Sequence, residues 1–133
     1  MQIDRREFVA LTGSLAVASA GRARERQGAG SMFGLIGKMT AMPGQRDALI
    51  AILLEGTTSM PGCLNYVVAT DPADANAIWI TEVWDNEASH KASLSLPAVH
   101  AAIAKAKPII AGFGERFVTS PVGGVGLPRA GGR

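Results

Sequence analysis

The residues best suited to chemistry lie in one short stretch, from Ile78 to His90, which holds both tryptophans and one of the two histidines. Free imidazole has a pKa of about 6.5, so His90 could take a proton from a substrate or bind a substrate oxygen at neutral pH. A histidine that only caps or covers a helix is an equal alternative. Trp84 could form a flat wall against an aromatic ring, a role that is compatible with packing in the core.

Three further side chains could contact the same substrate. Asn65 could donate a hydrogen bond to a developing oxyanion, or could be a polar residue beside a turn. Tyr66 could do the same or belong to the core, and Arg116 could pair either with a substrate anion or with Glu82 across the sheet. The candidate catalytic residues are therefore His90, Asn65 and Trp84, and the candidate substrate-binding residues are Tyr66, Trp84 and Arg116.

Charge and cysteine content argue against several other kinds of site. Cys63 is alone, so we expect neither an intrachain disulfide nor a cysteine-rich metal site. His90 and His100 stand without a cluster of acidic residues, so we expect no metal ion. Five arginines against three acidic residues give residues 1–31 the whole net charge of +2, and the near-neutral remainder does not suit nucleic acid.

Residues 1–31 have the pattern of an export signal. Arg5 and Arg6 precede an uncharged apolar run from Phe8 to Ala20, which ends in the small-residue pattern Ala-Ser-Ala of a signal-peptidase site. The paired arginines resemble a twin-arginine signal.

Export would place the protein in the periplasm and leave residues 21–31 as a mobile arm. The apolar run is too short to cross a bilayer, so we expect no membrane span. The alternative is that translation starts at Met32 and that the protein remains in the cytoplasm.

Residues 32–120 alternate between strand and helix patterns. Short runs rich in β-branched and aromatic residues predict strands at 33–42, 63–70, 77–84 and 113–120. Apolar residues at three- and four-residue spacing predict a helix between Gln45 and Met60, and a second helical region from Asp85 to Ala111. Leu96-Pro97 divides that second region, and Pro108 predicts a kink or an early end.

The order of these elements predicts an α+β fold of the ferredoxin-like type, βαββαβ, with an antiparallel four-stranded sheet and its helices on one face. Each predicted strand carries apolar residues on both sides. The face without helices therefore needs a cover, and we expect a homodimer that packs sheet against sheet. Residues 121–133, rich in glycine and proline, form a separate C-terminal tail.

Four short motifs resemble those of the antibiotic biosynthesis monooxygenase domain family, which includes quinol monooxygenases. The resemblance spans about residues 33–120, and its motifs are Pro43-Gly44, Pro61-Gly62-Cys63-Leu64-Asn65-Tyr66, Glu82-Val83-Trp84-Asp85 and His90-Lys91-Ala92-Ser93. It implies a dimeric α/β barrel. For some members it also implies oxidation of phenols or quinols by dioxygen without metal or flavin, whereas related barrels degrade haem, isomerise lactones or have no known activity.

Two positions depart from this family pattern. The better-understood cofactor-free members carry an asparagine where this chain has Ile80, and haem-degrading relatives carry one in the first strand, where residues 33–42 have none. The leading hypothesis is an exported, cofactor-independent monooxygenase that acts on a quinol or polyphenol. The alternatives are a non-catalytic barrel that binds a small aromatic ligand, and a haem-binding or haem-degrading relative with His90 or His100 as axial ligand.

Overall fold

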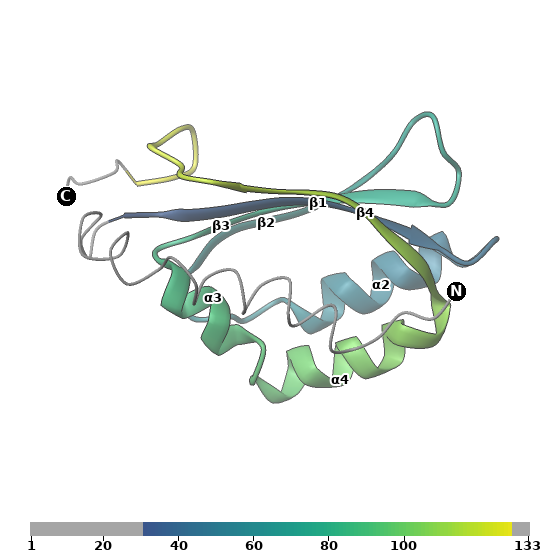
Figure 1. Ribbon diagram of the computed structural model, residues 1–133. Helices are drawn as coiled ribbons and strands as arrows, with labels where there is room; N and C mark the ends of the chain where they lie inside the picture. The colour runs from purple at the N-terminus through teal and green to yellow at the C-terminus, as the bar shows by residue number, and fades with distance from the viewer. Residues whose placement is uncertain (1–30, 129–133) are drawn as a thin grey trace.

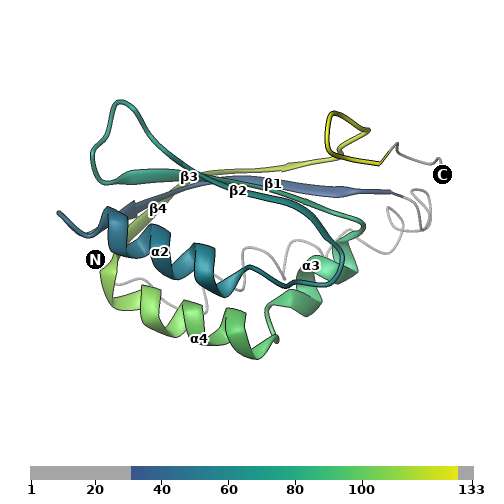
Figure 2. The same cartoon turned by 180° about the vertical axis from the view of Figure 1, so that it is seen from behind.

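The computed structural model describes residues 31–128, in which all the helices cover one face of a four-stranded sheet (Figures 1 and 2). Every strand pairing is antiparallel and the strand order is β2-β3-β1-β4. The predicted α+β, ferredoxin-like fold is confirmed. The elements in chain order are β1 (Phe33–Ala41), α2 (Arg46–Gly56), β2 (Cys63–Thr70), β3 (Ala77–Trp84), α3 (Glu87–Ser93), α4 (Pro97–Ala106), a 3-10 turn (Lys107–Ile109) and β4 (Ile110–Thr119).

The last strand begins earlier than the sequence predicts. The sequence predicts helix to Ala111 and a strand from Phe113, but α4 ends at Ala106 and β4 starts at Ile110. Pro108 has no N–H to donate to a helix, so the chain tightens into the 3-10 turn. The β-branched Ile110 then joins the sheet opposite Ala41 of β1.

The helix α3 is held in place at its first turn. The side chain of Asn86 accepts a hydrogen bond from the Ser89 N–H at 2.8 Å, which satisfies one of the free N–H groups at this helix end. Gly62 packs against the same turn with a positive φ of 86°, and a Cβ there would lie 2.5 Å from the Ser89 Cβ. Only glycine fits both the backbone angle and the close approach.

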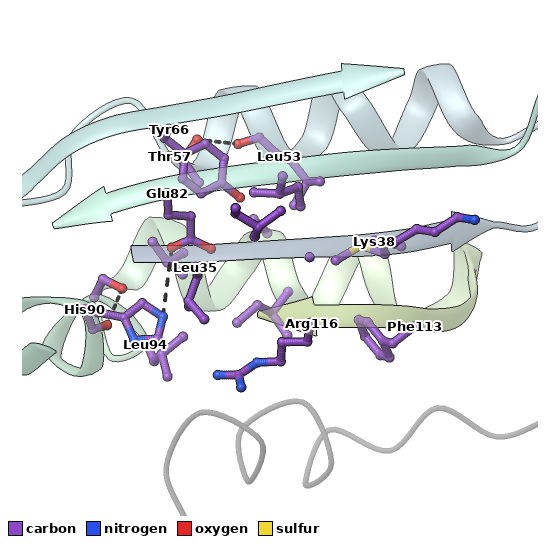
Figure 3. A pocket seen from close by; sticks show the side chains of 18 of the residues that line it. Leu35, Lys38, Leu53, Thr57, Tyr66, Glu82, His90, Leu94, Phe113 and Arg116 are labelled. Atoms are coloured by element: carbon purple, nitrogen blue, oxygen red, sulfur yellow. Dashed lines mark hydrogen bonds and ion pairs between the residues drawn. The ribbon is translucent and has the colours of Figure 1, made fainter. Parts of the chain in front are cut away.

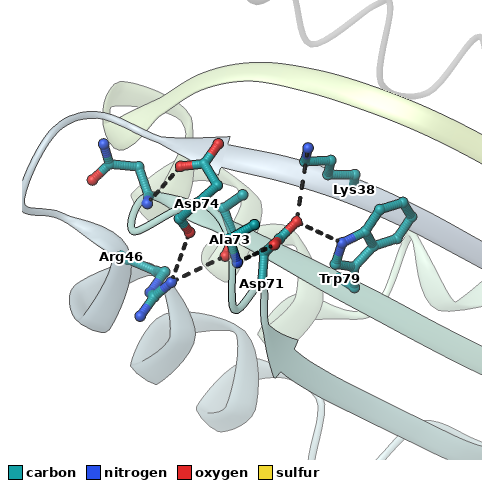
Figure 4. A network of polar contacts seen from close by, with 8 residues as sticks. Lys38, Arg46, Asp71, Ala73, Asp74 and Trp79 are labelled. Atoms are coloured by element: carbon teal, nitrogen blue, oxygen red, sulfur yellow. Dashed lines mark hydrogen bonds and ion pairs between the residues drawn. The ribbon is translucent and has the colours of Figure 1, made fainter.

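The loop between β2 and β3 is tied to its neighbours by a polar network (Figure 4). The Asp71 carboxylate accepts hydrogen bonds from the Ala73 N–H at 2.8 Å and from the Trp79 indole at 3.0 Å, and Lys38 lies 3.8 Å away. Arg46 of α2 donates to the Asp74 carbonyl at 3.0 Å. This network explains how a turn rich in Asp, Asn and Pro keeps a fixed position.

Large apolar side chains lie on both faces of the sheet, as the sequence predicts. The core lies between the sheet and the helices, where Leu49 and Ile78 are fully buried and Met39 packs beside them. The opposite face leaves Val67 and Phe117 exposed by 46% and 53%.

The predicted signal and the last residues of the predicted tail lie outside the described range, at residues 1–30 and 129–133. Of the tail, residues 121–128 are described and contain no helix or strand. From Ser31 to Pro128, no helix has the length and apolar character needed to span a bilayer.

Candidate functional site

A cavity of about 140 Å³ lies between the sheet and the helices, under β1 and β3 (Figure 3). It is comparable in size to a cavity of roughly 150 Å³ that binds benzene. Most of its wall is apolar, with side chains from five elements: Leu35, Met39, Leu53, Ile80, Val99, Ile103 and Phe113. One aromatic ring is the natural size of its occupant.

Part of this cavity is open because Gly37 has no side chain. Gly37 faces the helices between Leu35 and Met39 on β1, because alternate residues of a strand share a face. A Cβ at Gly37 would meet only the Glu115 carbonyl, at 3.9 Å. Gly37 therefore leaves part of the cavity empty, whereas the side chains of Leu35 and Met39 fill the space on either side of it.

Strand β3 brings a carboxylate and an indole to the cavity. Ile78, Ile80, Glu82 and Trp84 alternate along its helix-facing side, and the last two line the cavity together with Ile80. The Trp84 ring is 1% exposed, and its Nε1–H donates to Glu82 Oε1 at 2.9 Å. Trp84 is thus both a core residue and the group that orients Glu82. Ile80 makes its part of the wall apolar.

His90 reaches the cavity from α3 and is 4% exposed. Its ring packs against Phe33 and Trp84, with centroids 5.2 Å and 5.5 Å away. Its Nε2 lies 3.9 Å from Glu82 Oε1, too far for a direct hydrogen bond. Its Nδ1 is buried and has no hydrogen-bond partner among the described residues. His90 is therefore neither a surface residue nor a cap.

Burial moves the pKa values of the two facing groups toward the neutral form of each. Loss of water, helped by the positive charges of Arg116 and Lys91, lowers the pKa of His90 to about 4. Loss of water also raises the pKa of Glu82, although the Trp84 hydrogen bond and Arg116 both act to lower it. At neutral pH, the imidazole is uncharged.

Tyr66 and Arg116 complete the polar part of the wall. Tyr66 stands opposite Glu82 in the pairing of β2 with β3. Burial, and then the charge of Glu82, raise its pKa well above the ordinary value, so the phenol is an O–H donor. Arg116 comes from β4 and is partly buried (Figure 3).

Of the two alternatives for Arg116, the cross-strand pair with Glu82 does not form, because β1 lies between their two strands. Arg116 stands opposite Gly37 in the pairing of β4 with β1. Its charge still acts on Glu82 through space.

Asn65 does not line the cavity, in contrast to the other four predicted site residues. A bulge between Cys63 and Asn65 shifts the register by one residue, so that Asn65 stands opposite Val83 and Tyr66 opposite Glu82. A shift of one residue exchanges the two faces of a strand. Asn65 therefore lies on the face away from the helices and cannot reach a molecule in the cavity.

The sequence analysis names Glu82 only as a possible partner of Arg116, although the sequence contains a signal for a larger role. A single carboxylate on the same strand face as Ile78, Ile80 and Trp84 must face the core, and the Glu82 side chain is only 18% exposed. His100, in contrast, is exposed on α4 and does not line the cavity. Across residues 31–128, no group of three His, Cys, Asp or Glu side chains is arranged to hold a metal ion.

Comparison with known proteins gives similarity across the whole described domain. A family model described as antibiotic biosynthesis monooxygenase matches residues 32–105. A structure from Chloroflexus aurantiacus J-10-fl, described as a candidate antibiotic biosynthesis monooxygenase, is 68% identical, covers 74% of this chain and 100% of its own, and has a TM-score of 0.72.

Two more distant relatives agree with this result. A structure from Bacteroides thetaiotaomicron VPI-5482 is 18% identical over 71% of this chain and 93% of its own, with a TM-score of 0.63, and supports the fold alone. An uncharacterised protein of Synechocystis sp. is 25% identical over 107 residues, which are 78% of this chain and 73% of that protein.

Proposed function

Because the chain belongs to the antibiotic biosynthesis monooxygenase family, we propose that it is a monooxygenase that oxidises a small quinol or polyphenol with dioxygen. The observation that carries this proposal is the convergence of Glu82, Trp84 and His90 on one cavity of single-ring size. Family membership alone would not carry it, since one fold hosts many reactions.

A phenolic substrate fits the distribution of polar and apolar groups. Its ring occupies the apolar part of the cavity, and its hydroxyl lies between Glu82 Oε1 and His90 Nε2. These two atoms are 3.9 Å apart. One oxygen atom can be within about 2.8 Å of both, the length of a hydrogen bond. Arg116 adds a positive charge that stabilises a substrate anion.

The reaction needs few protein groups. Loss of the hydroxyl proton makes the ring electron-rich enough to reduce dioxygen, and the resulting peroxide forms on a ring carbon. Cleavage of its O–O bond leaves one oxygen atom on the ring as a quinone carbonyl and releases the other as water, so the ring supplies all four electrons. The apolar wall keeps water from the intermediate.

We propose that no metal, flavin or haem takes part, with dioxygen as the co-substrate. A porphyrin is far larger than a cavity of about 140 Å³. Of the two potential axial ligands, His100 is exposed and His90 lies against Glu82, Phe33 and Trp84. The residues present do not fit haem.

We propose that a second copy of the chain covers the open face of the sheet. Val67 and Phe117 are large apolar residues on that face, at 46% and 53% exposure. A symmetric pair of sheets buries the same patch from both subunits. We also propose export through the twin-arginine pathway, which rests on the sequence of residues 1–31 and is tested by the N-terminal residue of the mature protein.

Oxygen uptake with a panel of hydroquinones and polyphenols tests the reaction. We expect uptake with wild type, unchanged uptake with His100→Ala, and a large loss with the double variant His90→Ala, Trp84→Phe. Equal rates in wild type and the double variant would remove these residues from the site. Ligand-induced stabilisation without turnover would instead support a non-catalytic binding protein.

A further inference from the structure

We propose that Glu82, and not His90, takes the proton from the substrate hydroxyl, while His90 acts as a neutral hydrogen-bond donor through Nε2. This assignment deepens the proposed function and rests on it for the identity of the substrate as a phenol. It reverses the role that the sequence suggests for His90.

The two ring nitrogens of His90 have different surroundings. Nε2 faces the Glu82 carboxylate at 3.9 Å, whereas Nδ1 is buried and has no partner among residues 31–128. The neutral imidazole carries its single proton on one nitrogen, and the neighbouring groups decide which one. A proton on Nδ1 would leave a buried N–H without an acceptor, which is costly. The proton therefore belongs on Nε2, on the side of Glu82.

This tautomer prevents His90 from acting as the base. Its only free lone pair is on Nδ1, which is inaccessible both to solvent and to a molecule in the cavity. A second proton there would also meet the positive charges of Arg116 and Lys91, in agreement with a pKa of about 4. At neutral pH, His90 can donate a hydrogen bond but cannot accept the substrate proton.

Glu82 has the properties that His90 lacks. Its carboxylate lines the cavity, and the Trp84 indole fixes Oε1 at 2.9 Å. Burial raises the pKa of Glu82, which reduces the difference between this pKa and that of a phenol, about 10. A carboxylate held in this way is a better base than one in water.

The proposed step conserves charge inside the cavity. The substrate O–H bond breaks, an O–H bond forms on the Glu82 carboxylate, and the electron pair stays on the substrate oxygen. His90 Nε2–H then donates to that oxygen. One negative charge moves from Glu82 to the substrate, and Arg116 remains near it throughout.

Nitrogen-15 NMR of the full protein tests the tautomer independently of turnover. We expect His90 to be the neutral Nε2–H form at pH 7 and to titrate near pH 4. An Nδ1–H tautomer of His90, or a midpoint at or above the free value of about 6.5, would overturn the proposal.

Para-nitrophenol, whose ionised form is coloured, tests the proton transfer without any oxidation. We expect wild type to ionise the bound phenol at a pH where it is neutral in water, and His90→Gln, which retains a side-chain N–H, to do so as well. Glu82→Gln, which retains an acceptor for Trp84, should not ionise it. Ionisation by Glu82→Gln but not by His90→Gln would overturn the assignment.

Steady-state kinetics separates the two residues where a quinol is turned over. Glu82→Gln should lower kcat by about 10²–10⁴-fold with a smaller change in KM, and should abolish the fall in kcat/KM at acid pH. His90→Gln should keep that fall. If the phenol is ionised but no oxygen is consumed, the proposed oxidation fails while the assignment of Glu82 stands.

Discussion

The indole Nε1–H of Trp84 donates a hydrogen bond of 2.9 Å to Oε1 of Glu82, two residues earlier on the same side of β3. A second tryptophan on this strand, Trp79, makes a similar bond of 3.0 Å to Asp71 on the opposite face. The strand thus holds one carboxylate for the cavity and another for the β2–β3 loop. Because only one of these two tryptophan–carboxylate hydrogen bonds lies at the cavity, matched substitutions of the two tryptophans test the role of the cavity.

Trp84→Phe should raise the pKa of Glu82 further, since the indole hydrogen bond acts to lower it. The fall in kcat/KM at acid pH, called the acid limb, should therefore move to higher pH. The free energy of unfolding should also fall by about 1–3 kcal/mol. Trp79→Phe is the control, because it loses a bond to a carboxylate outside the cavity and should leave the limb in place. A limb that stays at the same pH in both variants contradicts the role of Trp84.

His90 should make folding stability depend on pH. Its pKa is about 4 in the folded protein and about 6.5 in the unfolded chain, so only the unfolded chain takes up a proton as the pH falls between these values. This difference in pKa adds about 3 kcal/mol to the free energy of unfolding above pH ~6.5. The contribution is lost as the pH falls from ~6.5 to ~4.

Glu82 acts in the opposite direction. Its raised pKa gives a contribution that is present below its unfolded pKa and lost as the pH rises through the folded pKa. Urea unfolding of wild type and His90→Gln at a series of pH values isolates the histidine, because Glu82 is present in both. Identical pH slopes would show that His90 is not buried in its neutral form.

Gly37→Val should fill part of the cavity without unfolding the protein. A Cβ at this position has open space around it, with its first neighbour at 3.9 Å. We expect the apparent affinity for hydroquinone, measured by ligand-induced thermal stabilisation, to fall at least tenfold. The valine side chain would occupy the space that the substrate ring needs. Unchanged affinity in a folded variant would place the ligand elsewhere.

Gly62→Ala should displace α3 and with it His90. The new Cβ would meet Ser89 at 2.5 Å, and the residue would also keep a strained φ of 86°. Gly44→Ala is the control, since Gly44 has a similar φ of 79° but nothing within 4 Å. Both should lose about 1 kcal/mol of stability from strain, and only Gly62→Ala should also lose oxygen uptake. An equal loss of uptake in both would mean that α3 does not position the site.

Phe117→Lys should convert a dimer into a monomer, because a lysine on an apolar interface remains unpaired and desolvated. Phe117 is 53% exposed on the open sheet face. Leu54→Lys is the matched control: Leu54 has a similar exposure, 49%, but lies on α2 on the other side of the sheet. Light scattering after gel filtration gives the mass of each. A monomeric wild type, or a dimer that survives Phe117→Lys, contradicts the proposed interface.

Most of the fold could be predicted because its signals are local. Strand alternation placed β2 and β3 at their observed bounds, and the Pro and Gly residues placed the ends of α2 and α3 to within a few positions. The end of α4 could not be placed in this way. Ile109 and Ile110 suit a helix and a strand equally well, and only the pairing of Ile110 with Ala41 decides between them.

The site could be predicted only in part, because register is a property of two strands together. Trp84, His90, Tyr66 and Arg116 line the cavity, and their proposed roles stay predictions. Asn65 does not, because the bulge after Cys63 exchanges the faces of β2, and no single-strand pattern reveals a bulge. The tautomer of His90 depends on what surrounds Nδ1, which only the packing of α3 against β3 determines.

The most direct test of the proposed monooxygenase is mass spectrometry of the product formed from a quinol under isotopically labelled dioxygen, with purified wild type and no added metal or flavin. We expect one labelled oxygen atom in the quinone product, equal label with His100→Ala, and almost no product with Glu82→Gln. Product without label, or labelled product at the same rate from Glu82→Gln, would contradict the account.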